Sequence, residues 1–370
     1  MKILKNIGLV ALTLITGFAT VGGNAIAADE PKVLNVYNWA DYLPDGLLAN
    51  FEKETGIKVR YDTFDTNEIV HAKLIAGRTG YDIIVPSANW AALHIQAGLF
   101  RKLDKAQLPN LKNTDPTMMK LLAEVDPGNQ HLVNWAWGFI TLGINVDKVK
   151  AALGDAPMPA NAWALFFDPQ YSSKLKSCGI SMLDSATDIF PAALHYIGKP
   201  AYSTNPADYA EAAKMMRAIR PNIKIFSSGI NDLAGGGLCM ALGYSGDMNI
   251  AAKRAREGKT GQKIEALVPS TGGLLFYDNM AIPLDAEHPN NAHIFINYIL
   301  RPEVAASISN KMNYATMNAA SEQFVDKDII ANKSIFLTPD AKKTMIASGT
   351  TTNDMRRTIT RAFTTFKTGL

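Results

Sequence analysis

Cysteine is scarce in this chain of 370 residues, which contains only Cys178 and Cys239. So few cysteines exclude a disulfide-rich scaffold, and because neither has a histidine or another cysteine nearby in sequence, they do not predict a metal site. In an oxidising compartment an isolated pair most simply forms one disulfide, which in the loop-entropy model contributes up to about 4 kcal/mol. Two buried free thiols are the alternative that the sequence leaves open.

The chain also lacks a large excess of charge of either sign. Its 37 basic and 34 acidic residues give a net charge of +3, which becomes +1 without Lys2 and Lys5 of the N-terminal segment. That balance excludes the broad basic surface of a general nucleic-acid-binding protein. With 47% hydrophobic residues, 19% charged residues and no low-complexity tract, the composition is that of a globular protein.

Long hydrophobic runs are missing as well. The apolar stretch at residues 7–19 is short for a transmembrane anchor, which is the alternative explanation for it. It follows two lysines and precedes the triplet Ala-Ile-Ala at 25–27. This pattern predicts a secretory signal peptide at residues 1–27 that is cleaved before Ala28. The mature protein is then expected in the periplasm, with neither a membrane span nor a lipid anchor.

The sequence lacks the common catalytic and metal-binding motifs. The run LGYSGD (242–247) does not complete a Gly-x-Ser-x-Gly motif, and the six scattered histidines include no His-Glu-x-x-His. EGKTG (257–261) lacks the earlier glycine of a phosphate-binding loop, and AGGGL (234–238) lacks a following lysine, so both segments predict turns. We therefore expect a non-enzymatic protein with no metal and no cofactor. A periplasmic hydrolase is the alternative from another class.

Short apolar runs do alternate with amphipathic stretches along the mature chain. Strands are expected at 33–39, 57–64 and 81–87, with a helix at 46–56 and another that begins at Thr66 or Asn67 and ends at Gly77. This alternation of strands and helices predicts an α/β fold, in which a largely parallel sheet carries helices on its faces.

The length of the chain predicts two domains. The strand-like run at 131–149 is too long for one ordinary strand, so we expect crossings between two lobes near 135–143 and 266–274. The first lobe is then discontinuous. The predicted boundaries are 28–138 and 270–312 for lobe 1, and 139–269 and 313–370 for lobe 2. A ligand is expected in the cleft between the lobes, because strand ends in α/β sheets face it.

Aspartates stand beside aromatic residues at the ends of three predicted strands. The three groups are Trp39, Asp41 and Tyr42; Tyr244 and Asp247; and Phe276, Tyr277 and Asp278. An aromatic face attracts a cation by about 0.5–2 kcal/mol, and a buried cation also needs a carboxylate. Core aromatics beside helix-capping aspartates are the alternative for any one group. Three groups that face one cleft predict a ligand with more than one positive charge and an apolar middle.

At these residues the chain resembles the periplasmic polyamine-binding proteins of ABC transporters, most closely the putrescine-binding branch. The resemblance extends from about residue 33 to the C-terminus and includes YNWADY (37–42), FEKETGIKVRYD (51–62), AGRTGYDIIVPS (76–87), KLKSCGISMLD (174–184), INDLAGG (230–236) and GYSGD (243–247). It implies the two-lobed fold of type II periplasmic solute-binding proteins, with two crossing segments. It also implies a monomer that encloses a diamine or polyamine and delivers it to an inner-membrane permease.

The resemblance implies roles for individual residues. Trp39, Tyr244 and Phe276 are the expected aromatic walls, Asp41, Asp247 and Asp278 are the expected ammonium partners, and Tyr42, Ser87, Asp188 and Tyr314 are further expected ligand contacts. It also implies that the two cysteines form a disulfide. Putrescine is the favoured ligand. The alternatives are another cationic amine, such as cadaverine, agmatine or spermidine, or a role as an amine-sensing receptor subunit.

Five positions or segments depart from the family pattern. Ala40 replaces a serine, Asp188 replaces a longer glutamate, Tyr244 stands where some members have tryptophan, Asn279 is new, and NWAW (134–137) replaces a proline–tyrosine segment near the hinge. One lost hydroxyl and one shortened acid change the reach and the hydrogen bonding of the expected site. An amino acid ligand is disfavoured, because none of the three aromatic groups contains an arginine for its carboxylate.

Overall fold

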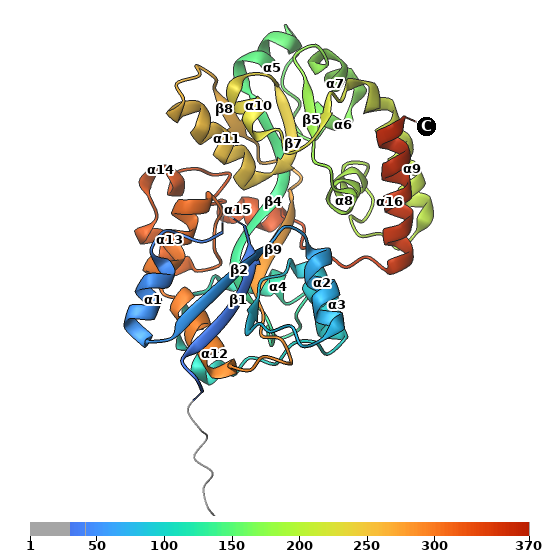
Figure 1. Ribbon diagram of the computed structural model, residues 1–370. Helices are drawn as coiled ribbons and strands as arrows, with labels where there is room; N and C mark the ends of the chain where they lie inside the picture. The colour runs from blue at the N-terminus through green and yellow to red at the C-terminus, as the bar shows by residue number, and fades with distance from the viewer. Residues whose placement is uncertain (1–29, 41, 370) are drawn as a thin grey trace, which may run out of the picture.

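The computed structural model describes residues 30–40 and 42–369, so the expected signal peptide at 1–27 and the candidate Asp41 lie outside the described residues. Figure 1 shows two lobes, one above the other, joined by β4 (Val133–Asn145) and β9 (Leu274–Met280). Within the described part of the chain, no helix combines the length and the apolar character that a membrane crossing requires. The expected two-lobed α/β fold is confirmed.

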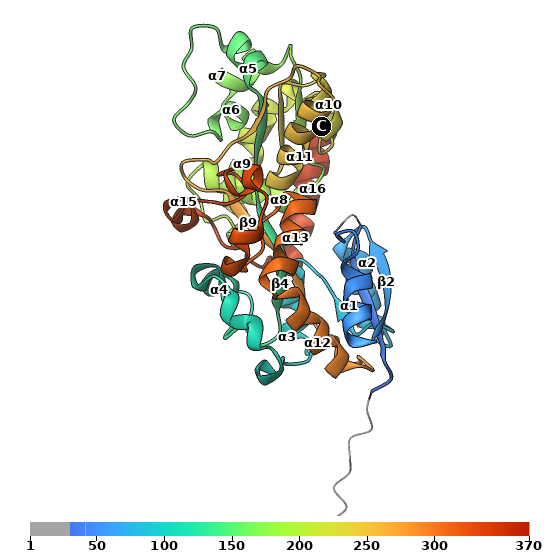
Figure 2. The ribbon, with the colours of Figure 1, turned by 90° about the vertical axis from the view of Figure 1, so that its left-hand side faces the viewer.

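The lower lobe of Figure 1 contains a parallel sheet in the order β2-β1-β3. It consists of β1 (Val33–Trp39), β2 (Lys58–Phe64) and β3 (Ile83–Ile84), with α1 (Leu47–Thr55), α2 (Asn67–Ala76), α3 (Ala88–Gln96), η1 (Lys105–Gln107), η2 (Pro109–Asn113) and α4 (Pro116–Leu122). Local sequence sets the ends of these helices. Thr66 caps α2 by accepting a hydrogen bond from the Ile69 amide, and Gly56 ends α1 with a φ of 73°. In Figure 2 this sheet, α1 and α2 lie on one side of the lobe and α4 on the other.

β4 is buried along its whole length and links the two lobes. Its residues Val133–Ile140 pair antiparallel with β9, and its residues Ile140–Ile144 pair antiparallel with β7 (Met240–Tyr244) of the upper lobe. The stretch predicted to be too long for an ordinary strand is therefore one strand of 13 residues that serves both lobes.

The upper lobe is built on a sheet in the order β6-β5-β7-β4-β8. Its other elements are α5 (Val146–Leu153), α6 (Ala164–Phe167), α7 (Pro169–Leu175), β5 (Ile180–Met182), α8 (Ala186–Tyr196), α9 (Pro206–Ile219), η3 (Arg220–Asn222), β6 (Ile225–Phe226), α10 (Ile230–Gly235), α11 (Ser245–Glu257) and β8 (Ile264–Ala266). Cys178 and Cys239 form a disulfide, with their Cα atoms 5.4 Å apart, just before β5 and β7. The expected disulfide is confirmed.

After β9 the chain runs through the lower lobe before it returns to the upper one. The intervening elements are α12 (Pro289–Ile299), α13 (Pro302–Met312), η4 (Ala319–Phe324), α14 (Lys327–Ile330) and α15 (Pro339–Thr344). Ala315, Ile335 and Met345 pack in the same hydrophobic cluster as Tyr37 and Ile84 of the lower sheet. The lobe boundaries stay a prediction, and this packing fits poorly with the boundary predicted at residue 313.

Residues 346–352 form a third connection between the lobes, which we did not predict. This segment begins beside β9, where the Ile346 amide donates to the Gly273 carbonyl and the Leu275 amide donates to the Ile346 carbonyl. It leads to α16 (Asn353–Thr368), which buries Ile359 and Phe363 in the core of the upper lobe. The C-terminal helix therefore belongs to the upper lobe, as Figure 1 shows.

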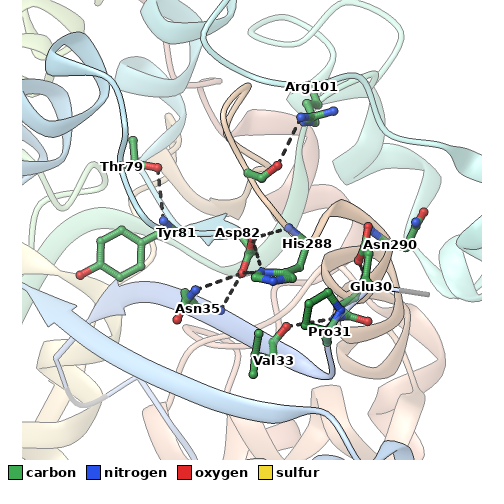
Figure 3. Close-up of polar contacts among 12 residues, drawn as sticks. Glu30, Pro31, Val33, Asn35, Thr79, Tyr81, Asp82, Arg101, His288 and Asn290 are labelled. Atoms are coloured by element: carbon green, nitrogen blue, oxygen red, sulfur yellow. Dashed lines mark hydrogen bonds and ion pairs between the residues drawn. The ribbon is translucent and has the colours of Figure 1, made fainter. Parts of the chain in front are cut away.

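A buried carboxylate ties distant parts of the lower lobe together (Figure 3). Asp82 is 1% exposed, and its oxygens accept hydrogen bonds from the backbone amides of Asn35 in β1 (2.9 Å) and of His288 before α12 (2.8 Å). The same carboxylate lies 3.1 Å from Nδ1 of His288. Beside it, Glu30 accepts a hydrogen bond from the amide of Asn290. The first described residues are thus fastened to α12.

Candidate ligand-binding site

One large cleft, with a volume of about 1030 Å³, lies between the lobes. Nine of the ten ligand-binding residues that we predicted line it, and the tenth, Asp41, lies outside the described residues. The nine are Trp39, Tyr42, Ser87, Asp188, Tyr244, Asp247, Phe276, Asp278 and Tyr314. Members of all three aromatic–aspartate groups therefore face one space, whereas Tyr277 of the third group does not line it and is fully buried in the core. That these residues bind a ligand stays a prediction.

Three aromatic rings form a wall of the cleft. The ring of Phe276 lies edge-to-face with Tyr244 and with Tyr314, at centroid distances of 5.1 and 5.7 Å. This is a favoured geometry for aromatic pairs, because the positive edge of one ring meets the negative face of the other. The wall combines one ring from β9, one from β7 of the upper lobe and one from the segment that follows α13.

Two glycines make room for this wall, and we did not predict a role for either. A Cβ atom on Gly138 of β4 would lie 2.7 Å from Cζ of Phe276, and one on Gly246 would lie 2.1 Å from Cζ of Tyr314. Both distances are shorter than non-bonded contacts allow. The sequence does contain a signal for Gly138, because a glycine inside a strand often marks a close approach by another group.

Asp278 is held by hydroxyl groups from two other elements. Oδ2 accepts a hydrogen bond from the hydroxyl of Tyr42 (2.8 Å), and Oδ1 accepts one from the hydroxyl of Ser87 (2.7 Å). The side chain lies in the interior, with only 3% of the residue exposed. Burial raises the pKa of Asp278 to about 6, although the two hydroxyl donors act in the opposite direction. The carboxylate is oriented by its neighbours, but it is not neutralised by them.

Asp188 and Tyr244 are two of the departures from the family pattern, and they contact each other. Asp188 lies in the first turn of α8, and its Oδ2 accepts hydrogen bonds from the hydroxyls of Tyr244 (2.8 Å) and Ser185 (2.5 Å). Burial raises the pKa of Asp188, and the negative charge of Glu68 adds to this effect. The hydrogen bonds from the two hydroxyls act in the opposite direction. A tryptophan at 244 would have no hydroxyl for this bond, so the two departures act as one change.

Asp247 repeats the same arrangement in the first turn of α11. Its Oδ1 accepts a hydrogen bond from the hydroxyl of Tyr314 (3.2 Å). Burial raises the pKa of Asp247 to about 6, against the hydroxyl of Tyr314 and the charge of Arg254, which both lower it. In turn, burial and the nearby carboxylate raise the pKa of Tyr314 well above its usual value, so the phenol remains a neutral donor.

Among the described residues, the three carboxylates form no ion pair with a basic side chain, although basic residues such as Arg254 also line the cleft. Within the described residues, the hydrogen-bond donors to Asp188, Asp247 and Asp278 are all neutral hydroxyl groups. The same residues include no group of three or more His, Cys, Asp or Glu side chains that is placed to hold a metal ion. Ala40 also lines the cleft, and it presents a methyl group where a serine would present a hydroxyl. Oriented carboxylates beside aromatic faces are suited to hold organic cations.

Comparison with known proteins identifies the family. A family model described as bacterial extracellular solute-binding protein matches residues 46–337. The chain belongs to this family. It is 43% identical over 363 residues to the putrescine-binding periplasmic protein SpuD of Pseudomonas aeruginosa, with 98% of each chain covered. It is 42% identical over 359 residues to the putrescine-binding periplasmic protein PotF of Escherichia coli, with 96% of this chain and 97% of that protein covered.

A solved structure shares the fold. The spermidine/putrescine ABC transporter substrate-binding protein PotD of Streptococcus pneumoniae superposes with a TM-score of 0.79, over 92% of this chain and 99% of that one, at 24% sequence identity. The type II arrangement expected from the sequence is thereby confirmed. The resemblance to periplasmic polyamine-binding proteins is confirmed as well, because the relatives named above span nearly the whole chain.

Proposed function

We propose that this chain is a non-enzymatic periplasmic binding protein that captures a diamine or polyamine, preferably putrescine, and delivers it to an ABC permease. The observation that carries the proposal is the set of three carboxylates, each oriented by a tyrosine hydroxyl, around an aromatic wall. Two relatives are named as putrescine-binding periplasmic proteins, which supports the choice of ligand. The N-terminal pattern supports export, with cleavage between Ala27 and Ala28. We propose that the mature protein works as a monomer.

The charges of the cleft define the chemistry of the ligand. An ammonium group that leaves water needs both a negative partner and hydrogen-bond acceptors, and a buried carboxylate supplies both. An aromatic face attracts the ammonium group and also covers the methylene groups between two such groups. A ligand with a positive charge at each end and an apolar middle satisfies all of these groups at once.

Ligand-driven closure of the lobes follows from where these groups come from. Ser87 belongs to the lower lobe, whereas Asp188 and Asp247 are carried by helices of the upper lobe. A ligand that contacts both sets is bound more tightly when the lobes are close together, so it shifts the population toward the closed state. An ABC permease can then distinguish the ligand-bound protein from the ligand-free protein, because only the ligand-bound protein is mainly closed.

Calorimetric titration tests the proposed function directly. We expect putrescine to bind more tightly than cadaverine, agmatine, spermidine or spermine. The matched control is butylamine, which has the same four-carbon chain but only one ammonium group. We expect it to bind at least about 100-fold more weakly, because one carboxylate is then left buried without a cation. If no diamine or polyamine gives either a heat of binding or a thermal shift, the proposal of an amine ligand is refuted.

The affinity for putrescine is expected to fall at acidic pH. Burial raises the pKa of Asp247 and of Asp278 to about 6, and a dication favours their ionised forms. Above about pH 7 both groups are ionised, whereas below about pH 6 protons must leave before the ligand binds. We expect the association constant to be about 100-fold lower near pH 5 than near pH 7.5, because each of the two groups contributes about a factor of ten. Calorimetry in buffers of different ionisation enthalpy measures both the affinity and the protons released, and a flat affinity profile would contradict this expectation.

A further inference from the structure

In another part of the cleft, a positively charged side chain of the protein itself lies on an aromatic ring, and a carboxylate lines the same cleft. The guanidinium carbon of Arg356 lies 4.4 Å from the ring centroid of Trp90. Arg356 lies near the start of α16 in the upper lobe, and Trp90 lies in α3 of the lower lobe. Both side chains line the cleft, as does Glu68 of α2. In Figure 1 the lower end of α16 lies beside α2 and α3, so this contact bridges the lobes.

The surroundings of Arg356 are those of an organic cation held in a binding site. The side chain is half-buried, and burial lowers the pKa of its guanidinium while the charge of Glu68 raises it. Within the described residues, its Nε is buried and has no hydrogen-bond partner. An aromatic face and the field of a carboxylate therefore hold this cation. The cleft residues offer the same two contacts to an ammonium group.

Glu68 connects this arrangement to the ligand cleft. Glu68 lines the same cleft as Arg356 and Asp188, and its negative charge raises the pKa of both. Glu68 is exposed, whereas Asp188 is only partly exposed, so the acids of the cleft continue from the less exposed part toward the edge. A polyamine longer than a diamine, with one end in the interior, would direct its further ammonium group along this line.

We propose that Arg356 occupies an additional ammonium subsite formed by Trp90 and Glu68, and that it thereby disfavours polyamines with a third amine relative to diamines. This inference rests on the proposed function. The guanidinium acts as a built-in competitor, because it places a positive charge on the ring that a third ammonium group would otherwise contact. It also repels such a group from the rest of the cleft edge.

Replacing Arg356 with glutamine is the test. Titration calorimetry with putrescine and with spermidine gives the ratio of the two affinities for each protein. We expect R356Q to raise the affinity for spermidine relative to putrescine by about tenfold, because a cation–aromatic contact becomes available and a like charge is removed. R356K, which keeps the charge, is expected to retain the ratio of the wild type.

The matched control is Arg357→Gln, one residue further along the same helix. Arg357 is exposed and pairs with Asp354, so R357Q removes an equal charge without freeing the Trp90 ring. We expect the affinity ratio of R357Q to be that of the wild type. An equal rise in R357Q would overturn the inference, because net charge alone would then explain the change.

A double variant isolates the subsite. Adding Glu68→Gln to R356Q is expected to remove most of the gain for spermidine, because the carboxylate partner is lost.

Two results for R356Q would overturn the inference. One is an unchanged affinity ratio. The other is a folded R356Q that loses affinity for both amines alike, because Arg356 would then act as a contact that favours closure. If the wild type fails to bind putrescine, the proposed function is wrong. If it binds putrescine and the ratio does not respond, only the subsite is wrong.

Discussion

Replacing Asp278 with asparagine is expected to weaken putrescine binding by at least about 100-fold. Truncating or neutralising one partner of a buried, hydrogen-bonded charge pair typically costs 2–5 kcal/mol, and each 1.4 kcal/mol corresponds to a factor of ten. Asp278 fits this case because it is 3% exposed and oriented by Tyr42 and Ser87. Asparagine keeps the shape of the side chain but offers no charge to an ammonium group. Titration calorimetry at neutral pH measures the loss.

The loss of affinity in D278N is expected without any loss of stability. The pKa of Asp278 is raised to about 6, above the value of about 3.9 for an unfolded chain. Its favourable contribution to stability is therefore present below about pH 4 and is lost as the pH rises through about 6. At neutral pH the ligand-free variant should be at least as stable as the wild type. D340N removes an equal charge from a side chain that is 93% exposed, and it should bind normally. Putrescine affinity within a few-fold of the wild type in D278N would contradict this assignment.

Replacing Asp82 with alanine is expected to lower the free energy of unfolding by about 3–5 kcal/mol. The carboxylate satisfies two backbone amides and pairs with His288, and removing one member of a buried pair leaves the others without a partner. Urea unfolding measures the change as a lower midpoint at a similar slope. D45N removes a carboxylate that is 96% exposed and should change stability by less than about 0.5 kcal/mol. A D82A midpoint equal to that of the wild type would show that the network of Figure 3 does not stabilise the lobe.

The secondary structure around the cleft could be predicted because it depends on neighbours in sequence. Alternation at 57–64 produces β2, and the hydroxyl of Thr66 together with Gly56 sets the ends of two helices. The end of β7 faces the cleft for a reason of topology, which is why Asp247 could be placed there. Asp278 also lines the cleft, but it lies inside the crossing strand β9 and not at a strand end as predicted.

The pairing of side chains could not be predicted in the same way. The sequence places Tyr42 and Asp278 in one cleft, but 236 residues separate them, and only the packed lobes show that one donates to the other. The contact of Arg356 with Trp90 joins two helices of different lobes and leaves no local signal. The third connection, at 346–352, has no periodic pattern, since irregular segments are defined by what they pack against.

The three connections between the lobes lie side by side. β4 pairs with β9, and residue 346 bridges to β9 at Leu274, so the lobes are joined by a narrow ribbon of hydrogen-bonded chain. A ribbon bends easily about an axis in its own plane and resists sliding of one strand along the next, because sliding breaks the hydrogen bonds between the strands. The lobes should therefore open and close by bending about this ribbon. Each closure then brings the same residues of the two lobes together again.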